Sequence, residues 1–288
     1  MTTLAPDRAP RERRLGSSAL RHVPLVVVAG IAAVAVLLAL FGPLLAPYDP
    51  DAQDLLTGAT LPGPGHVLGT DDVGRDVLSR LIVGARSAVV GPVVIALGSL
   101  LLGSCIGLVA GYLGGTVGSV LMRAVDLVYS LPALLVALVV GGVLGGGYWL
   151  AVALLIILFS PFDARVVRGA TLEQRGRPYV EAARLLGVPR WRIMLLEIWP
   201  NVRPVELANA FLNFSYGLVY LTALSFLGIG VPPGTADWGR MLAEGISYLE
   251  LNPWGALAPG LAILLVAASV TLLGDRLEEY LADRGRVR

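Results

Sequence analysis

The sequence has no lysine, only one cysteine and two histidines, and each scarcity excludes a kind of site. All 22 basic residues are arginine, so a phosphate-binding Gly-Lys-Ser/Thr loop is excluded. Cys105 alone cannot form a disulfide framework or a cysteine-based metal site, and His22 and His66 lie far apart in the sequence. HExxH and Gly-x-Ser-x-Gly motifs are also missing. We therefore expect no catalytic residue, no metal site and no bound cofactor in this chain.

Charged residues are scarce as well. They make up 15% of the chain against 56% hydrophobic residues, and the mean hydropathy is +0.74. An ordinary soluble domain is about half apolar and about a quarter charged. The composition therefore predicts an integral membrane protein, and a formal net charge of +1 gives no reason to expect nucleic acid as a partner.

Long apolar runs predict an all-α membrane protein with six transmembrane helices. The first run, 23–46, follows an arginine-rich tail, 1–22, and lacks a small-residue cleavage pattern. It is therefore interpreted as a retained span and not as a cleaved signal peptide. The remaining spans are expected in a core over 88–277, at about 88–111, 118–140, 148–166, 205–230 and 256–273.

The segments between the spans are polar. Residues 47–87 form the first outer segment, in which Asp76 to Leu81 has the apolar spacing of a short amphipathic helix. A charged loop occupies 167–204, an outer loop occupies 231–255, and a short tail follows at 278–288. Pro132 lies inside the third span and is placed to kink it.

Arginine distribution predicts the orientation of these spans. With the N-terminus in the cytoplasm, eighteen arginines lie on the cytoplasmic side, and only Arg75, Arg80, Arg86 and Arg240 lie outside. Cytoplasmic loops of membrane proteins carry such an excess of basic residues. Both termini and the loop 167–204 are therefore expected in the cytoplasm.

That cytoplasmic loop has the pattern of two short helices joined by a hinge. Pro178 suits a first helical turn, and Glu181 places a negative charge near the positive helix end. Gly187 is placed to adopt the left-handed conformation just past the helix end, and Pro189 can start the next helix. A helix of about eight residues is marginal in water, so it is expected to dock on another surface.

Glu181-Ala182-Ala183, followed by Gly187 and Pro200, resembles the EAA loop of ABC-type importer permeases. In that family the loop forms a coupling helix that sits in a groove of the partner ATPase. The resemblance implies that the ATPase-coupling residues here are Glu181, Ala182, Ala183, Leu186 and Gly187. The chain departs from the family pattern at Glu197 and Trp199, so no role is assigned to these two residues.

A second stretch, His66 to Gly91, resembles one subfamily of these permeases in particular. Its Leu68-Gly69-Thr70-Asp71 and Gly74-Arg75-Asp76 strings, followed by Ser79-Arg80 and Gly84-Ala85-Arg86, resemble the C-type permease subunit of dipeptide, oligopeptide and nickel importers. The outer region from Val231 to Gly260 resembles the same subfamily.

The resemblance implies a type I ABC importer permease in the bacterial plasma membrane. Its partners would be a homologous second permease, two cytoplasmic ATPase subunits or one fused ATPase, and an extracytoplasmic solute-binding protein, besides membrane lipid. ATP and Mg would be bound by the ATPases. Dipeptides or oligopeptides are the favoured substrates, and nickel chelates, glutathione and haem remain alternatives. Rival hypotheses are an ion-gradient-driven secondary transporter and a non-transporting membrane scaffold.

Five polar residues of the fifth span recur at spacings of three or four, which places them on one helix face. They are Glu206, Asn209, Asn213, Tyr216 and Tyr220. Such a stripe either holds helices together or lines a translocation path. We favour the path, because the two tyrosine rings can contact a peptide.

Two further patterns concern helix contacts. Gly98, Gly103, Gly107 and Gly111 line the second span at spacings of four or five residues. Small residues of this kind indicate close packing against another helix or against a partner subunit. In the third span, Arg123 and Asp126 are three residues apart and are expected to pair on one helix face.

Overall fold

The computed structural model describes residues 25–286, and side chains as far as Tyr280. Within that range the chain is helical and contains no β-strand. In chain order its elements are α1 (Leu25–Leu45), α2 (Val77–Leu113), α3 (Gly115–Tyr129), α4 (Ala133–Val143), α5 (Tyr148–Arg175), α6 (Pro178–Leu185), α7 (Arg190–Arg192), the π-helical segment η2 (Ile193–Ile198), α8 (Trp199–Phe226), α9 (Trp238–Gly245) and α10 (Trp254–Arg286). The predicted all-helical class is confirmed.

Five helical stretches in the described range are long and apolar enough to cross a membrane: α1, α2, α5, the run from α7 to α8, and α10. The predicted third span is divided into α3 and α4, which meet at 81° and together make a sixth candidate. Pro132 lies directly before α4 and has no backbone N–H to continue a helix. It also disfavours helical backbone at Leu131. The expected kink at Pro132 is thus a complete break.

Helix α2 is the centre of the bundle and packs along α5, α8 and α1. The four glycines of its stripe face α5: a Cβ built on Gly107 would lie 2.6 Å from the Cβ of Val167 and 2.7 Å from the carbonyl oxygen of Ala164. The equivalent atom on Gly111 would lie 2.8 Å from the Cβ of Thr171. The glycine stripe therefore packs against another helix of this chain. Of the two alternatives given by the sequence, another helix or a partner subunit, the structure shows the first.

The helical spacing expected from Asp76 to Leu81 belongs to the start of α2. Asp76 caps α2 by accepting a hydrogen bond from the backbone N–H of Ser79 at 2.8 Å, and the helix then continues to Leu113 without interruption. The stretch from Asp76 to Leu81 is thus the cap and first turn of a long helix. The expected helical stretch is present, and it is longer than a short amphipathic helix because it continues directly into the second span.

A buried ion cluster joins the beginning of α2 to α9. Arg80 has only 1% of its side chain exposed, and its Nη2 lies 3.4 Å from Glu244 Oε2. Arg75 Nη2 lies 3.3 Å from the same oxygen, and Arg75 Nε lies 2.6 Å from Asp71 Oδ2. Ion pairs at this end of the bundle therefore join residues that are about 170 positions apart in the sequence.

The expected pairing of Arg123 with Asp126 was wrong. Asp126 instead pairs with Arg165 of α5, at 2.7 Å between Oδ1 and Nη2, and Arg165 also lies 4.0 Å from the ring centroid of Tyr129. The reason is that α3 packs against α5, which brings a cation from another helix within reach.

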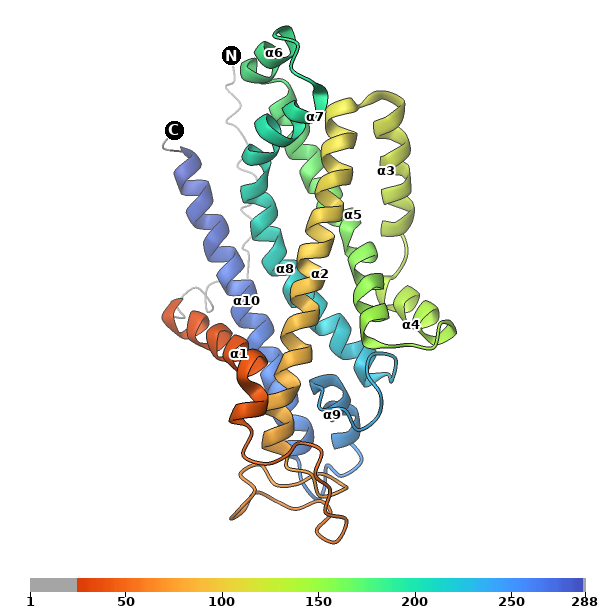
Figure 1. Ribbon diagram of the computed structural model, residues 1–288, viewed down its shortest axis with the longest axis vertical. Coiled ribbons are helices and arrows are strands. Elements are labelled where there is room, and N and C mark those ends of the chain that lie inside the picture. Colours follow the sequence, from red (N-terminus) through yellow and green to blue (C-terminus); the bar gives the residue numbers. More distant parts are fainter. Residues whose placement is uncertain (1–24, 287–288) are drawn as a thin grey trace, which may run out of the picture.

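The bundle has two distinct ends (Figure 1). Helices α6 and α7 lie at the same end as the last turns of α10, whereas the segment between α1 and α2 lies with α9 at the opposite end. The EAA-like loop and the first outer segment are therefore separated by the length of the bundle.

Candidate functional site

The first candidate site is helix α6, which carries the Glu-Ala-Ala string. Val180 anchors it, with 0% of its surface exposed, in a cluster formed with residues of α2, α5, η2 and α8. Tyr179 adds a polar attachment by donating from its hydroxyl to Gln174 Oε1 at 2.8 Å. Burial raises the pKa of the Tyr179 phenol, so this hydroxyl keeps its proton.

The other face of α6 is exposed. Glu181 and Ala182 are exposed, Ala183 is half-buried, and Leu185 and Leu186 have 84% and 82% of their surfaces exposed. Two neighbouring leucines at such exposure form an apolar surface beside small alanine side chains. This surface is suited to close packing against another protein.

Gly187 ends α6 in the predicted conformation, with φ of +74°. Its N–H donates to Arg184 O at 3.0 Å, and the N–H of Val188 donates to Ala183 O at 3.1 Å. These two bonds form a Schellman motif, in which the left-handed residue is usually glycine. The motif fixes the angle between α6 and the chain that follows it.

The π-helical segment after α7 was missed by the sequence analysis, which expected one regular helix from Pro189 onward. Ile193 and Ile198 have 1% and 0% of their surfaces exposed, and they are five residues apart. The wider π turn places residues of that spacing on one face. In the sequence, the five-residue interval between these two isoleucines is the feature that could have indicated a π-helical turn.

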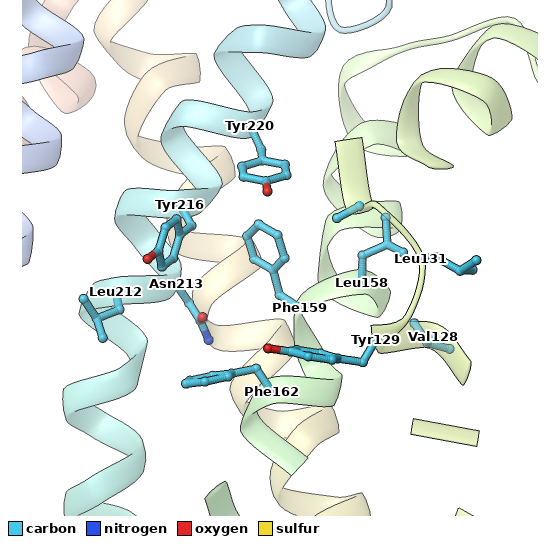
Figure 2. Close-up of a pocket in the computed structure, with 11 residues that line it drawn as sticks. Val128, Tyr129, Leu131, Leu158, Phe159, Phe162, Leu212, Asn213, Tyr216 and Tyr220 are labelled. Atoms are coloured by element: carbon cyan, nitrogen blue, oxygen red, sulfur yellow. The ribbon is translucent and has the colours of Figure 1, made fainter. Parts of the chain in front are cut away.

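The second candidate site is a pocket of about 400 Å³ among α3, α4, α5 and α8. Figure 2 shows that Tyr129 of α3 and Phe159 and Phe162 of α5 approach Asn213, Tyr216 and Tyr220 of α8. The remaining lining residues are aliphatic: Val128, Leu131, Ala133, Leu158 and Leu212. The pocket thus combines aromatic walls with a few polar groups, as small-molecule sites commonly do.

Asn213 is held in this pocket by bonds to two other helices. Its Nδ2 donates to Asp163 Oδ2 at 2.7 Å and to Ser99 Oγ at 3.0 Å. Both amide hydrogens are therefore engaged, and no hydrogen bond within the described part of the chain reaches the amide oxygen. That oxygen is the group with which Asn213 can accept a hydrogen bond from a solute in the pocket.

The five residues of the polar stripe do not share one environment. Asn213, Tyr216 and Tyr220 line the pocket, whereas Glu206 and Asn209 lie outside its lining. Glu206 is buried and accepts hydrogen bonds from Ser104 Oγ of α2 and from Trp199 Nε1, the latter at 3.2 Å. Glu206 therefore joins α8 to α2, Tyr216 and Tyr220 face the pocket, and Asn213 does both.

Comparison with known proteins identifies the fold and the family. Residues 103–287 match the binding-protein-dependent transport system inner membrane component, a match that includes α6 and the aromatic pocket. The chain belongs to this permease family. Residues 19–62 of the permease also match the N-terminal TM domain of oligopeptide transport permease C, which confirms the resemblance to C-type permeases of ABC importers.

Relatives of the permease extend over most of its length. It is 39% identical over 249 residues to the di/tripeptide transport system permease protein DppC of Pseudomonas aeruginosa, covering 84% of this chain and 82% of that protein. It is 32% identical over 273 residues to the oligopeptide transport system permease protein OppC of Bacillus subtilis, covering 95% and 88%. It is 34% identical over 250 residues to the glutathione transport system permease protein GsiD of Pectobacterium atrosepticum, covering 85% and 81%.

A solved structure has the same fold. The permease superposes on a chain of the inward-facing MetNI methionine ABC transporter with a TM-score of 0.55 and 19% identity, covering 69% of this chain and 95% of that chain. At this identity the likeness is one of fold alone.

Proposed function

We propose that the permease forms half of the translocation pore of an ATP-driven importer for dipeptides or oligopeptides. A homologous permease completes the pore, two cytoplasmic ATPase subunits or one fused ATPase drive it, and an extracytoplasmic binding protein delivers the peptide. The observation that carries this proposal is the pairing of two features in one chain of this family. An exposed apolar α6 is available to an ATPase, and an aromatic pocket lies farther along the bundle.

In this mechanism α6 transmits motion. Closure of the ATPases pushes on the surface formed by Glu181, Ala182, Ala183, Leu186 and Gly187. Val180 is buried against the spans, so a displacement of α6 is passed to α2, α5 and α8. These helices reorient and expose the pocket to one side of the membrane at a time, which is alternating access.

The arginine distribution and the separation of the two ends of the bundle support an orientation in the membrane. We place both termini and α6 in the cytoplasm of a bacterial cell, with the protein in its plasma membrane. The segment between α1 and α2, together with α9, then faces the binding protein. The buried ion cluster at Arg80 joins α2 to α9 at that outer end.

The pocket accounts for a preference for peptides. Aromatic rings contact apolar side chains of many shapes, and the oxygen of Asn213 accepts a hydrogen bond from a peptide N–H. Glutathione fits the same description, and the similarity to GsiD makes it the second candidate. Nickel chelates and haem remain alternatives, and the aromatic lining gives no specific support to either.

The test is ATP-dependent uptake of a radiolabelled dipeptide by proteoliposomes that contain the whole importer and its binding protein. Ala182→Trp adds bulk to the exposed face of α6 and should abolish uptake while ATP hydrolysis continues. Leu264→Trp on α10, a residue with 63% of its surface exposed, is the matched control and should transport normally. Uptake that needs an ion gradient but no ATP would instead support a secondary transporter.

A further inference from the structure

A second pocket, of about 400 Å³, lies beside α6 and is lined by three arginines. Arg175 is the last residue of α5, Arg184 lies in the last turn of α6, and Arg190 begins α7. The end of α2 supplies another part of the wall through Tyr112 and Leu113. Segments from four elements thus bring three positive charges to one hollow.

No acidic residue lines this pocket, and none of its three guanidinium groups forms an ion pair within the described residues. Nearby Arg177 differs, because it pairs with Glu173 at 2.7 Å between Nη2 and Oε1. Like charges that converge without a counter-ion repel one another. Arg175 is half-buried, whereas Arg184 and Arg190 are exposed to water, which screens part of this repulsion. An anion in the pocket would meet three positive charges and no competing acidic residue.

Two of the arginines are held in place by neutral groups. Arg184 Nε donates to Tyr112 Oη at 3.3 Å, and the guanidinium carbon lies 4.9 Å from the centroid of the tyrosine ring. Arg175 Nη1 donates to Gly111 O at 3.5 Å. A guanidinium has five N–H donors, so each group retains several donors for an anion. Its planar fork matches phosphate oxygens in particular.

The surroundings place this pocket where a membrane surface would lie. Leu113 ends an apolar span, and Trp191, which directly follows Arg190, has 55% of its surface exposed. Leu195 and Leu196 in the next turn have 49% and 63% exposed. Tryptophan and aliphatic side chains beside arginines at the end of a span are typical of headgroup depth.

We propose that Arg175, Arg184 and Arg190 form a binding site for a phosphate-ester anion, which either an anionic phospholipid or a soluble phosphate ester supplies. A bound anion bridges the ends of α2, α5, α6 and α7. It would hold α6 against the spans and so strengthen the coupling path; this consequence rests on the proposed function, whereas the binding itself does not.

The experiment is native mass spectrometry of the whole importer complex after exposure to equal amounts of phosphatidylglycerol and phosphatidylcholine. The wild type should retain phosphatidylglycerol selectively. A triple variant, Arg175→Gln with Arg184→Gln and Arg190→Gln, should retain about a hundredfold less, since each arginine near a membrane surface contributes about fivefold to the affinity for an anionic lipid. Arg203→Gln removes an exposed arginine that does not line the pocket and is the matched control.

A second triple variant, with lysine at the same three positions, separates loss of charge from misfolding. It keeps the charge but loses the planar fork, so it should retain more lipid than the glutamine variant and less than the wild type. Millimolar glycerol phosphate identifies the source of the anion. Displacement of the lipid indicates that soluble phosphate esters occupy the site, and resistance to displacement indicates that a lipid is required.

Three results would overturn the proposal. One is a glutamine variant that retains phosphatidylglycerol as the wild type does. Another is a lysine variant that loses the lipid as fully as the glutamine variant. The third is selective loss of the ATPase subunits with lipid retention unchanged, which would assign the arginines to carboxylates of the ATPase. Peptide uptake is not measured in this experiment, so its result is independent of the substrate proposal.

Discussion

Replacing Gly107 with alanine tests the packing of α2 against α5. The new Cβ would lie 2.6 Å from the Cβ of Val167 and 2.7 Å from the backbone oxygen of Ala164. The second contact is with backbone, so rotation of a side chain cannot relieve it. The two helices must separate by several tenths of an ångström along a seam that also contains Gly111.

Two opposing effects set the expected magnitude. Overpacking a close interface costs about 1–3 kcal/mol, whereas glycine to alanine in a helix interior gains about 1 kcal/mol from backbone entropy. Gly169→Ala is the matched control, because Gly169 lies within α5 and has no atom within 4 Å of its built Cβ. We expect Gly169→Ala to be neutral or stabilising, and Gly107→Ala to be about 1–3 kcal/mol less stable than this control.

The assay is thermal unfolding of the purified chain in a mild detergent, followed by tryptophan fluorescence. A difference of about 1 kcal/mol corresponds to about 2–4 °C for a protein of this size. If Gly107→Ala unfolds at the same temperature as Gly169→Ala or above it, then α2 and α5 are not packed as closely as described, and the argument fails.

Three further predictions concern the coupling helix, the pocket and the outer end. Gly187→Ala should lower peptide uptake at constant ATP hydrolysis, since an alanine in the left-handed backbone conformation costs about 1–2 kcal/mol. Gly187→Asn should lower uptake less, and equal uptake by both variants and the wild type would contradict this prediction. Asn213→Leu should lower thermal stability by about 1–3 kcal/mol, because two buried acceptors lose their donor; an unchanged melting temperature would show that these bonds are unimportant. Glu244→Leu should cost about 1–3 kcal/mol in a denaturant titration, because buried Arg80 loses one of its two carboxylates and keeps Asp71 at 3.6 Å from its Nε; Asp126→Asn, which breaks an exposed pair, should cost no more than about 1 kcal/mol.

Features that depend on a few neighbouring residues were predictable from the sequence. Pro178 begins α6, Gly187 ends it with positive φ, and Pro132 breaks the third span. In each case the backbone preference of a single residue decides the outcome, so nothing distant is needed. The apolar runs were predictable for a similar reason, because the length of a span is set by the membrane.

Features that depend on distant partners were not predictable. Asp126 had a candidate three residues away, yet it pairs with Arg165, which is 39 positions away in the sequence. Glu206 and Asn213 share one predicted helix face, but Glu206 meets Ser104 whereas Asn213 meets Asp163 and borders the pocket. Periodicity gives the face of a helix, and only packing decides which neighbour each part of that face meets.

The break in the third span depends on one local residue, and its consequence depends on a distant packing partner. Tyr129 ends α3 and Leu131 lies in the break, and both line the aromatic pocket opposite Tyr216. A continuous helix through Pro132 would remove the 81° bend and direct α4 along α3. Tyr129 and Leu131 would then no longer lie at a corner facing α8. A local property of proline thus shapes a pocket whose other wall is nearly ninety residues away in the sequence, so the pocket follows from the combination of a local break and a distant packing partner.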